Sequence, residues 1–125
     1  WSEYLTIARL KQDPEGFSME FAPVSAPFGA GVLLDFASTD NYLALIVADN
    51  GNLWTFDMVD GSATWWDQGI GPGGPVYAWS IAWAGQEVDV LVNGQPWSTT
   101  LSNPPAAGLV VNGSSMLFER ITWQP

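Results

Sequence analysis

Aromatic side chains are the residues of this sequence best suited to form a binding surface. The chain holds 8 Trp, 6 Phe and 3 Tyr. Such rings stack on the apolar C–H faces of sugars, while Asn, Asp and Gln at the rim bind the hydroxyls. Core packing is the alternative role of each ring, because Trp is highly buried on average. The candidate exposed, carbohydrate-binding aromatics are Tyr42, Trp54, Phe56, Trp65 and Trp97.

Paired carboxylates are the feature that could support catalysis. Glu87 and Asp89 lie two residues apart, so on a strand they share one face about 7 Å apart, a spacing suited to an inverting glycoside hydrolase. Alternating acid and valine is also typical of an ordinary half-exposed strand. The chain has no cysteine and no histidine, which removes the thiol nucleophile and the imidazole base. We therefore expect no enzyme, with a glycoside hydrolase as the least favoured alternative.

Metal ligands are limited to oxygen atoms for the same reason, which favours calcium over a transition metal. The candidate ligands cluster at three turns, Asp40-Asn41, Asp49 to Asn52, and Asp60. Asp and Asn also suit such turns without a metal ion, because they tolerate positive φ and hydrogen-bond to their own backbone. No cofactor is predicted, and calcium stays open as the one ion that these turns could hold.

Net charge excludes two classes of partner. The chain has 13 acidic residues and three basic ones, Arg9, Lys11 and Arg120, which gives a formal charge of −10. Such a surface repels phosphate backbones and anionic lipids, and no apolar run approaches the about 18 residues of a membrane span. We therefore expect no nucleic acid partner and no membrane insertion. Charged residues make up 13% of the chain, about half the usual share, so neutral polar and apolar side chains must cover much of the exterior.

Short strands must position these residues. Alternation of side chains predicts about ten strands and no helix. Asp60-Gly61 and Asn93-Gly94 supply positive φ for tight hairpin turns, and 69–75 is expected to form a loop within the domain. The pattern predicts an all-β, antiparallel β-sandwich of jelly-roll type, formed by one domain over residues 1–125. The predicted strands are 4–9, 17–21, 31–36, 42–48, 53–59, 64–67, 76–84, 87–92, 107–111 and 115–123.

Five segments carry a resemblance to a known family. They are Tyr42–Val47, Leu53-Trp54 after a polar turn, Val88–Gly94, Ala107–Val110 and Leu117–Ile121. Over residues 17–123 the chain resembles the laminin-G-like, concanavalin-A-like lectin sandwiches, in the short versions found as modules of bacterial extracellular proteins. The resemblance implies a jelly roll, often with a calcium ion at its loops. Related hydrolases need a third carboxylate where this chain has Leu91.

Alignment on these motifs assigns the faces of the strands. An outer face then carries Tyr42, Ala44 and Ile46 on one strand and Ala78, Ser80 and Ala82 on another, with no charge among them. Something other than bulk water is expected to cover this face, because strands with one wet side alternate apolar with polar residues. The residues expected to point into the core are Leu43, Leu45, Val47, Trp79, Ile81, Trp83, Val88, Val90 and Val92.

The orientation of the strand 53–59 is less clear from hydrophobicity, which alone would bury Trp54, Phe56 and Met58. The family register instead places them on the outer face. We favour the outer face, because Thr55 and Asp57 can find partners or solvent near a sheet edge. Trp65 and Trp66 are adjacent, so one of them faces outward in any register.

These observations favour a non-catalytic, lectin-like module that binds a polysaccharide or oligosaccharide through exposed aromatics on one sheet face. The sequence starts at Trp1 without Met, which indicates a piece of a larger protein, expected to be extracellular or at the cell surface. The alternative is an adhesion or assembly domain whose apolar face docks a partner protein or a second copy. Polar residues around the aromatics favour a sugar, and an unbroken apolar patch favours a protein.

Overall fold

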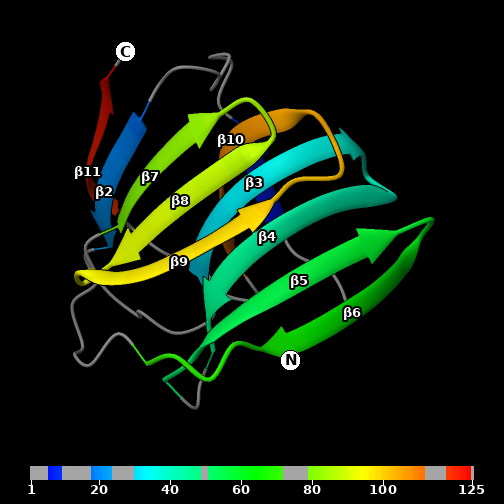
Figure 1. Cartoon of the computed structure of the whole chain (residues 1–125), viewed down its shortest axis with the longest axis horizontal. Helices are drawn as coiled ribbons and strands as arrows, with labels where there is room; N and C mark the ends of the chain where they lie inside the picture. Colours follow the sequence, from blue (N-terminus) through cyan, green and yellow to red (C-terminus); the bar gives the residue numbers. More distant parts are fainter. Residues whose placement is uncertain are drawn as a thin grey trace.

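Two antiparallel sheets pack face to face in a computed structural model that describes residues 6–9, 18–23, 30–48, 51–71, 79–111 and 118–124 (Figure 1). The predicted all-β sandwich is therefore confirmed. In the described residues, the six-stranded sheet has the order β1 (Thr6–Arg9), β10 (Pro105–Val111), β3 (Ala30–Ser38), β4 (Asn41–Val47), β5 (Leu53–Val59) and β6 (Ser62–Asp67). The five-stranded sheet has the order β11 (Phe118–Gln124), β2 (Ser18–Pro23), β7 (Trp79–Ala84), β8 (Glu87–Val92) and β9 (Gln95–Thr100).

Strand β9 is the element that the sequence pattern does not predict. Pro96 has no amide hydrogen to donate, and the hydroxyl-bearing residues 98–100 give the segment little apolar character. Among the described strands, β9 pairs with β8 alone and forms the edge of the five-stranded sheet. An edge position tolerates proline, because one side of the strand has no partner to bond.

Tight turns fix the register of the hairpins. Asp60 and Gly61 have φ of 49° and 79°, and Asn93 and Gly94 have φ of 49° and 82°. Two central residues with positive φ are typical of two-residue hairpin loops, whose twist matches that of the strands. Both predicted turns are confirmed. The turn at Gly61 sets β5 against β6 so that residues 54 and 67 lie opposite each other.

The core between the sheets contains the side chains that the sequence assigns to it. Val88, Val90 and Val92 alternate with exposed residues along β8. Trp83 donates its indole N–H to the carbonyl oxygen of Leu34 at 3.1 Å, so its one polar atom is satisfied in the core. Buried members of this cluster include Leu45, Val47, Trp79, Ile81, Trp83, Val88, Val90 and Val92, with Leu43 partly buried against them.

A second buried cluster lies on the outer face of the six-stranded sheet, which is the face turned away from the five-stranded sheet. Its members come from β3, β4, β5 and β10, and β4 is apolar on both sides because both of its sides are buried. This burial differs from the expected exposed aromatic face. The buried members are Leu33, Tyr42, Ala44, Ile46, Phe56, Met58, Ala106 and Val110.

One side of the six-stranded sheet continues past the edge of the other sheet. In Figure 1, β9 is the last strand of the front sheet, and β5 and β6 extend beyond it. Asp57 of β5 and Trp66 of β6 therefore border an open edge, whereas Leu53 at the start of β5 belongs to the closed core. Among the described residues, no helix is long and apolar enough to cross a membrane.

Candidate functional site

A row of aromatic rings crosses the outer face of the six-stranded sheet. Phe36 stacks on Tyr42 with ring centroids 5.9 Å apart, and Tyr42 stacks on Phe56 at 5.7 Å. Phe56 then meets Trp65 edge to face at 4.6 Å, and Trp65 meets Trp54 at 6.5 Å. Strand register explains the row, because Phe36 lies opposite Tyr42 and Phe56 lies opposite Trp65. The outer-face orientation favoured for Trp54, Phe56 and Met58 is confirmed.

Exposure along this row is uneven, and the expected exposure of Tyr42 and Phe56 is wrong. Tyr42 is 3% exposed and Phe56 is 0% exposed, because both rings are packed into the second buried cluster with Met58. Trp54 and Trp65 are half-buried and lie at the margin of that cluster. The row is therefore partly accessible at its two ends: at Trp54 and Trp65 on β5 and β6, and at half-buried Phe36 on β3, whose ring centroid lies 4.3 Å from the Arg9 guanidinium carbon. Four of the five predicted residues share this face, and only two of those four can reach a ligand.

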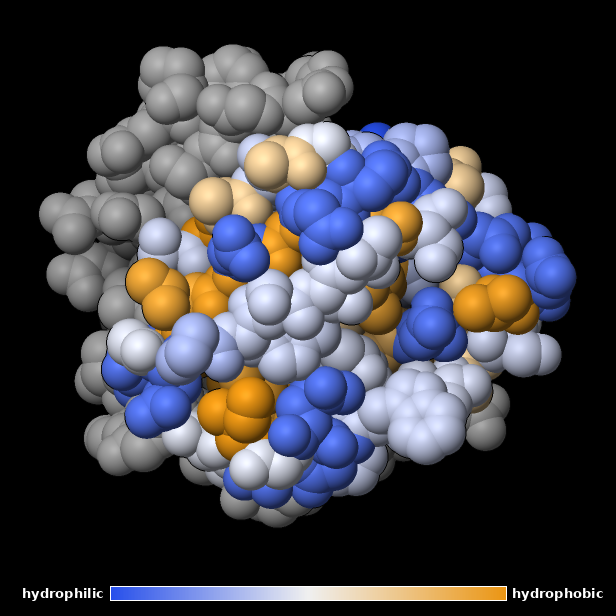
Figure 2. All heavy atoms as spheres, in the orientation of Figure 1, coloured by the Kyte–Doolittle hydropathy of each residue, from blue (hydrophilic) through white to orange (hydrophobic). Residues whose placement is uncertain are grey.

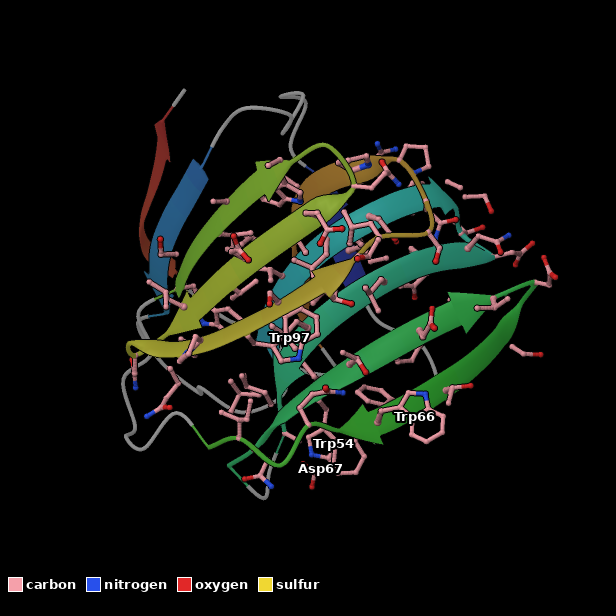
Figure 3. All side chains as sticks on the ribbon, viewed as in Figure 1. Trp54, Trp66, Asp67 and Trp97 are labelled. Atoms are coloured by element: carbon pink, nitrogen blue, oxygen red, sulfur yellow. The ribbon has the colours of Figure 1, made fainter. Side chains whose placement is uncertain are left out.

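Polar groups accompany the accessible end of the row. Asp67 lies opposite Trp54 in the register of β5 and β6, and Figure 3 shows the two side chains together at the lower end of these strands. The Asp67 carboxylate accepts hydrogen bonds from the Asn52 amide at 3.1 and 3.2 Å and from the backbone N–H of Gly69 at 2.7 Å. We call Trp54, Trp65, Asn52 and Asp67 the outer aromatic site.

A groove opens on the other face of the same hairpin, at the edge between the two sheets. It has a volume of about 420 Å³ and includes Trp97 from β9, Asp57 from β5 and Trp66 from β6. Trp66 is 60% exposed, and in Figure 3 Trp97 lies on β9 and Trp66 on β6. In Figure 2 this side of the molecule is largely hydrophilic, with hydrophobic residues in separate patches. We call this cavity the inter-sheet groove.

Trp97 lies in the groove, away from the other four predicted aromatics. Its indole N–H donates to the Gln68 side-chain oxygen at 3.1 Å, and the Gln68 amide donates to the Thr55 hydroxyl at 3.1 Å. This chain of hydrogen bonds joins the two sheets and orients the half-buried Trp97 ring. The sequence did not single out Trp66, Asp67 and Gln68. The adjacency of Trp65 and Trp66 indicated opposite faces but not which ring would be the more exposed.

Two carboxyl groups line the groove. Asp35 and Asp57 both lie opposite Leu43 in the strand registers, from its two sides. Asp35 is 1% exposed and accepts hydrogen bonds from the backbone N–H and the side-chain amide of Asn103, each at 3.1 Å. Partial burial, and then the neighbouring Asp35 carboxylate, raise the pKa of Asp57 above its ordinary value of 3.8.

The raised pKa of Asp57 predicts a stability cost at neutral pH. Between the ordinary and the raised value the folded state keeps a proton that the unfolded state has lost, so stability falls as pH rises through this window. Asp57→Asn should therefore increase the free energy of unfolding at pH 7, by less than about 1 kcal/mol because solvent screens this partly exposed group. Urea unfolding at pH 7 and pH 3 checks this. An equal gain in the free energy of unfolding at pH 7 and pH 3, or a loss at pH 7, would contradict this prediction.

The other residues singled out by the sequence have separate locations. Glu87 and Asp89 are exposed on β8, and the Glu87 carboxylate accepts a hydrogen bond from the Thr100 hydroxyl at 2.8 Å. The Asn41 side-chain oxygen accepts a hydrogen bond from the backbone N–H of Asp60 at 3.0 Å and so supports the hairpin turn. Within the described part of the chain, no three acidic side chains converge as a metal site. Asp49, Asn50 and Ala78 lie outside the described residues, and calcium binding stays a prediction.

Solved structures resemble the chain over nearly its full length, although no protein-family model and no curated protein sequence matches it. A toad ovary galectin in complex with thio-digalactose has a TM-score of 0.69 at 14% identity, over 98% of this chain and 100% of the galectin. The carbohydrate-binding module CBM66 from Bacillus subtilis has a TM-score of 0.70 at 14% identity, over 100% of this chain and 84% of that module. Xenopus laevis galectin-Ib has a TM-score of 0.69 at 13% identity, over 96% of this chain and 99% of the galectin.

These likenesses show the fold. The chain has the galectin-like, concanavalin-A-like jelly-roll sandwich, in agreement with the fold that the sequence resemblance implied. The three proteins are two galectins and a carbohydrate-binding module, and none is named as an enzyme.

Proposed function

We propose that the protein is a non-catalytic carbohydrate-binding module that binds a neutral glycan at the outer aromatic site. The observation that carries this proposal is the position of half-buried Trp54 and Trp65 beside the exposed Asp67 carboxylate. Similar folds named as galectins and as a carbohydrate-binding module support the ligand class. We place the module in a larger secreted or surface protein, of the laminin-G-like type found in bacteria.

The two tryptophan rings suit the apolar faces of sugar rings. They meet at an interplanar angle of 68°, so their faces point in different directions and can contact different parts of a sugar chain. Packing of Trp65 against buried Phe56 holds the pair in place before a ligand arrives. Such preorganisation reduces the entropy lost on binding.

Polar groups at the site favour sugar hydroxyls. The Asn52 amide and the Gly69 backbone N–H hold the Asp67 carboxylate in one orientation, and a carboxylate oxygen can accept more than one hydrogen bond. The net charge of −10 disfavours uronate or sulfated chains. A neutral polysaccharide therefore fits the site better than an acidic one.

Substitution of Trp54 tests the proposal. Trp54→Ala should weaken retention by polysaccharide about tenfold or more, because aromatic anchors carry a large share of binding energy. Affinity electrophoresis over cellulose, xylan, mannan, galactan and β-glucan measures the effect. Leu91→Ala is the matched control, since Leu91 is 46% exposed on the outer side of β8, away from the site, and should retain normal binding.

Two outcomes would contradict the proposal. If the wild-type protein is retained by a polysaccharide and folded Trp54→Ala is retained equally, the glycan binds elsewhere. If no polysaccharide in the panel retains the wild-type protein, the adhesion or assembly function gains weight. Sedimentation analysis would then test for a second copy bound through the same face.

A further inference from the structure

We infer that the inter-sheet groove is a second saccharide site, separate from the outer aromatic site and formed on the opposite face of the β5–β6 hairpin. It takes its ligand class, a neutral sugar, from the proposed function. Its location, shape and residues are independent of the outer aromatic site.

Strand alternation places the two sites back to back. Successive side chains of a strand point to opposite faces, so Trp65 belongs to the outer face and Trp66 to the groove. On β5, Trp54 points outward while Thr55 and Asp57 line the groove. One short hairpin therefore presents an aromatic surface on each of its faces.

The two groove tryptophans come from different sheets. Trp66 is 60% exposed, the most exposed of the large hydrophobic side chains in the described residues, so core packing does not explain its presence. Trp97 is fixed by its hydrogen bond to Gln68 and packs partly against the core. A rigid ring on one wall and an exposed ring on the other suit a flat ligand that lies between the sheets.

Unused polar atoms also line the groove. Among the described residues, none donates a hydrogen bond to the Asp57 carboxylate, although it lines the cavity. The Asn41 side-chain oxygen accepts a hydrogen bond from the backbone N–H of Asp60, so the amide N–H groups of the same side chain can act as donors to a ligand. An acceptor and a donor on neighbouring strands match the paired hydroxyls of a sugar.

The lining of the groove favours a neutral sugar over a charged ligand. Among the described residues of its lining, the acidic ones are Asp35 and Asp57 and none is Lys or Arg, so an acidic sugar would be repelled. The Asp35 carboxylate is already bonded by Asn103, and the remaining polar lining consists of hydroxyl and amide groups. A volume of about 420 Å³ lies near the lower end of the range for ligand sites, which suits a short segment of a sugar chain.

Indole N–H resonances in a ¹H–¹⁵N spectrum can report the two sites separately. The probes are neutral hexasaccharides of β-linked glucose, xylose and mannose, and tetramethylammonium is the cationic control. We expect one hexasaccharide to shift the Trp97 resonance, because a ligand against this ring alters its hydrogen bond to Gln68. Trp66→Ala should weaken that response about three- to tenfold, while the Trp54 resonance responds as before. Leu91→Ala should change neither response.

The same spectra distinguish the failure of this inference from the failure of the proposed function. If sugar shifts Trp54 and leaves Trp97 unmoved at saturation, the groove is no saccharide site, while the outer aromatic site stands. If sugar shifts Trp97 alone, the groove is supported and the outer aromatic site fails. An equal Trp97 response in Trp66→Ala, or a response to tetramethylammonium only, would overturn the inference.

Discussion

Phe56→Ala is expected to lower the free energy of unfolding by about 3–5 kcal/mol, the range for removal of a fully buried phenylalanine. Phe56 is 0% exposed and ranks first by volume among the fully buried side chains of the described residues. Its ring contacts Tyr42 and Trp65, so its removal leaves a cavity between the sealed and the accessible parts of the aromatic row. Urea unfolding followed by tryptophan fluorescence measures the loss.

Trp66→Ala provides the comparison for this experiment. Trp66 lies on the same hairpin but is 60% exposed, so its removal should change stability by no more than about 0.5 kcal/mol. A loss below about 1 kcal/mol for Phe56→Ala would show that solvent reaches this ring. The accessible surface would then extend to Tyr42, as the sequence first indicated.

Gly31→Ala is the second change with a large expected effect. A Cβ atom at Gly31 would lie 2.6 Å from the Cα atom of Ile46 and would overlap the carbonyl oxygen of Leu45. Both contacts are with backbone, so β3 and β4 would have to separate at the centre of the six-stranded sheet. We expect a loss of about 2–3 kcal/mol or more, as for severe overpacking.

Gly71→Ala is the matched control for the Gly31 substitution. A Cβ atom at Gly71 would have its nearest contact at 3.5 Å, with the side-chain oxygen of Asn52, which is ordinary van der Waals spacing. This variant should unfold at nearly the wild-type urea concentration. If Gly31→Ala is equally stable, the two strands do not approach as closely as the structure shows.

Strands were most predictable where alternation and turn residues agree. The bounds of β5 and β8 match the sequence-based ranges, because Asp60-Gly61 and Asn93-Gly94 mark where these strands end. Strand β9 escaped prediction because an edge strand can contain Pro96 and hydroxyl-bearing residues. Its pairing depends on β8 rather than on its own propensity.

The candidate site was predictable in orientation but not in exposure. The sequence placed Thr55 and Asp57 inward because partners or solvent are available near a sheet edge. In the structure Gln68 donates a hydrogen bond to the Thr55 hydroxyl, and Asp57 lines the open groove. The alternation of side chains along a strand indicates which face of the sheet a residue lies on, but not whether that face is buried or exposed to solvent. Tyr42 and Phe56 are buried in a cluster that also takes side chains from β3 and β10, and the alternation of a single strand does not record such packing between strands.

The two-residue turn at Asp60 and Gly61 joins β5 to β6 and fixes which side chains lie on each face of this hairpin. Sliding one strand past the other by a single position would turn every side chain of that strand over. Trp65 would then face the groove and Trp66 the outer face, and Trp65 would lose its contacts with Trp54 and Phe56. With both turn residues at positive φ, there is no spare length to absorb such a slip. Lengthening this turn by one residue would therefore disturb both faces at once.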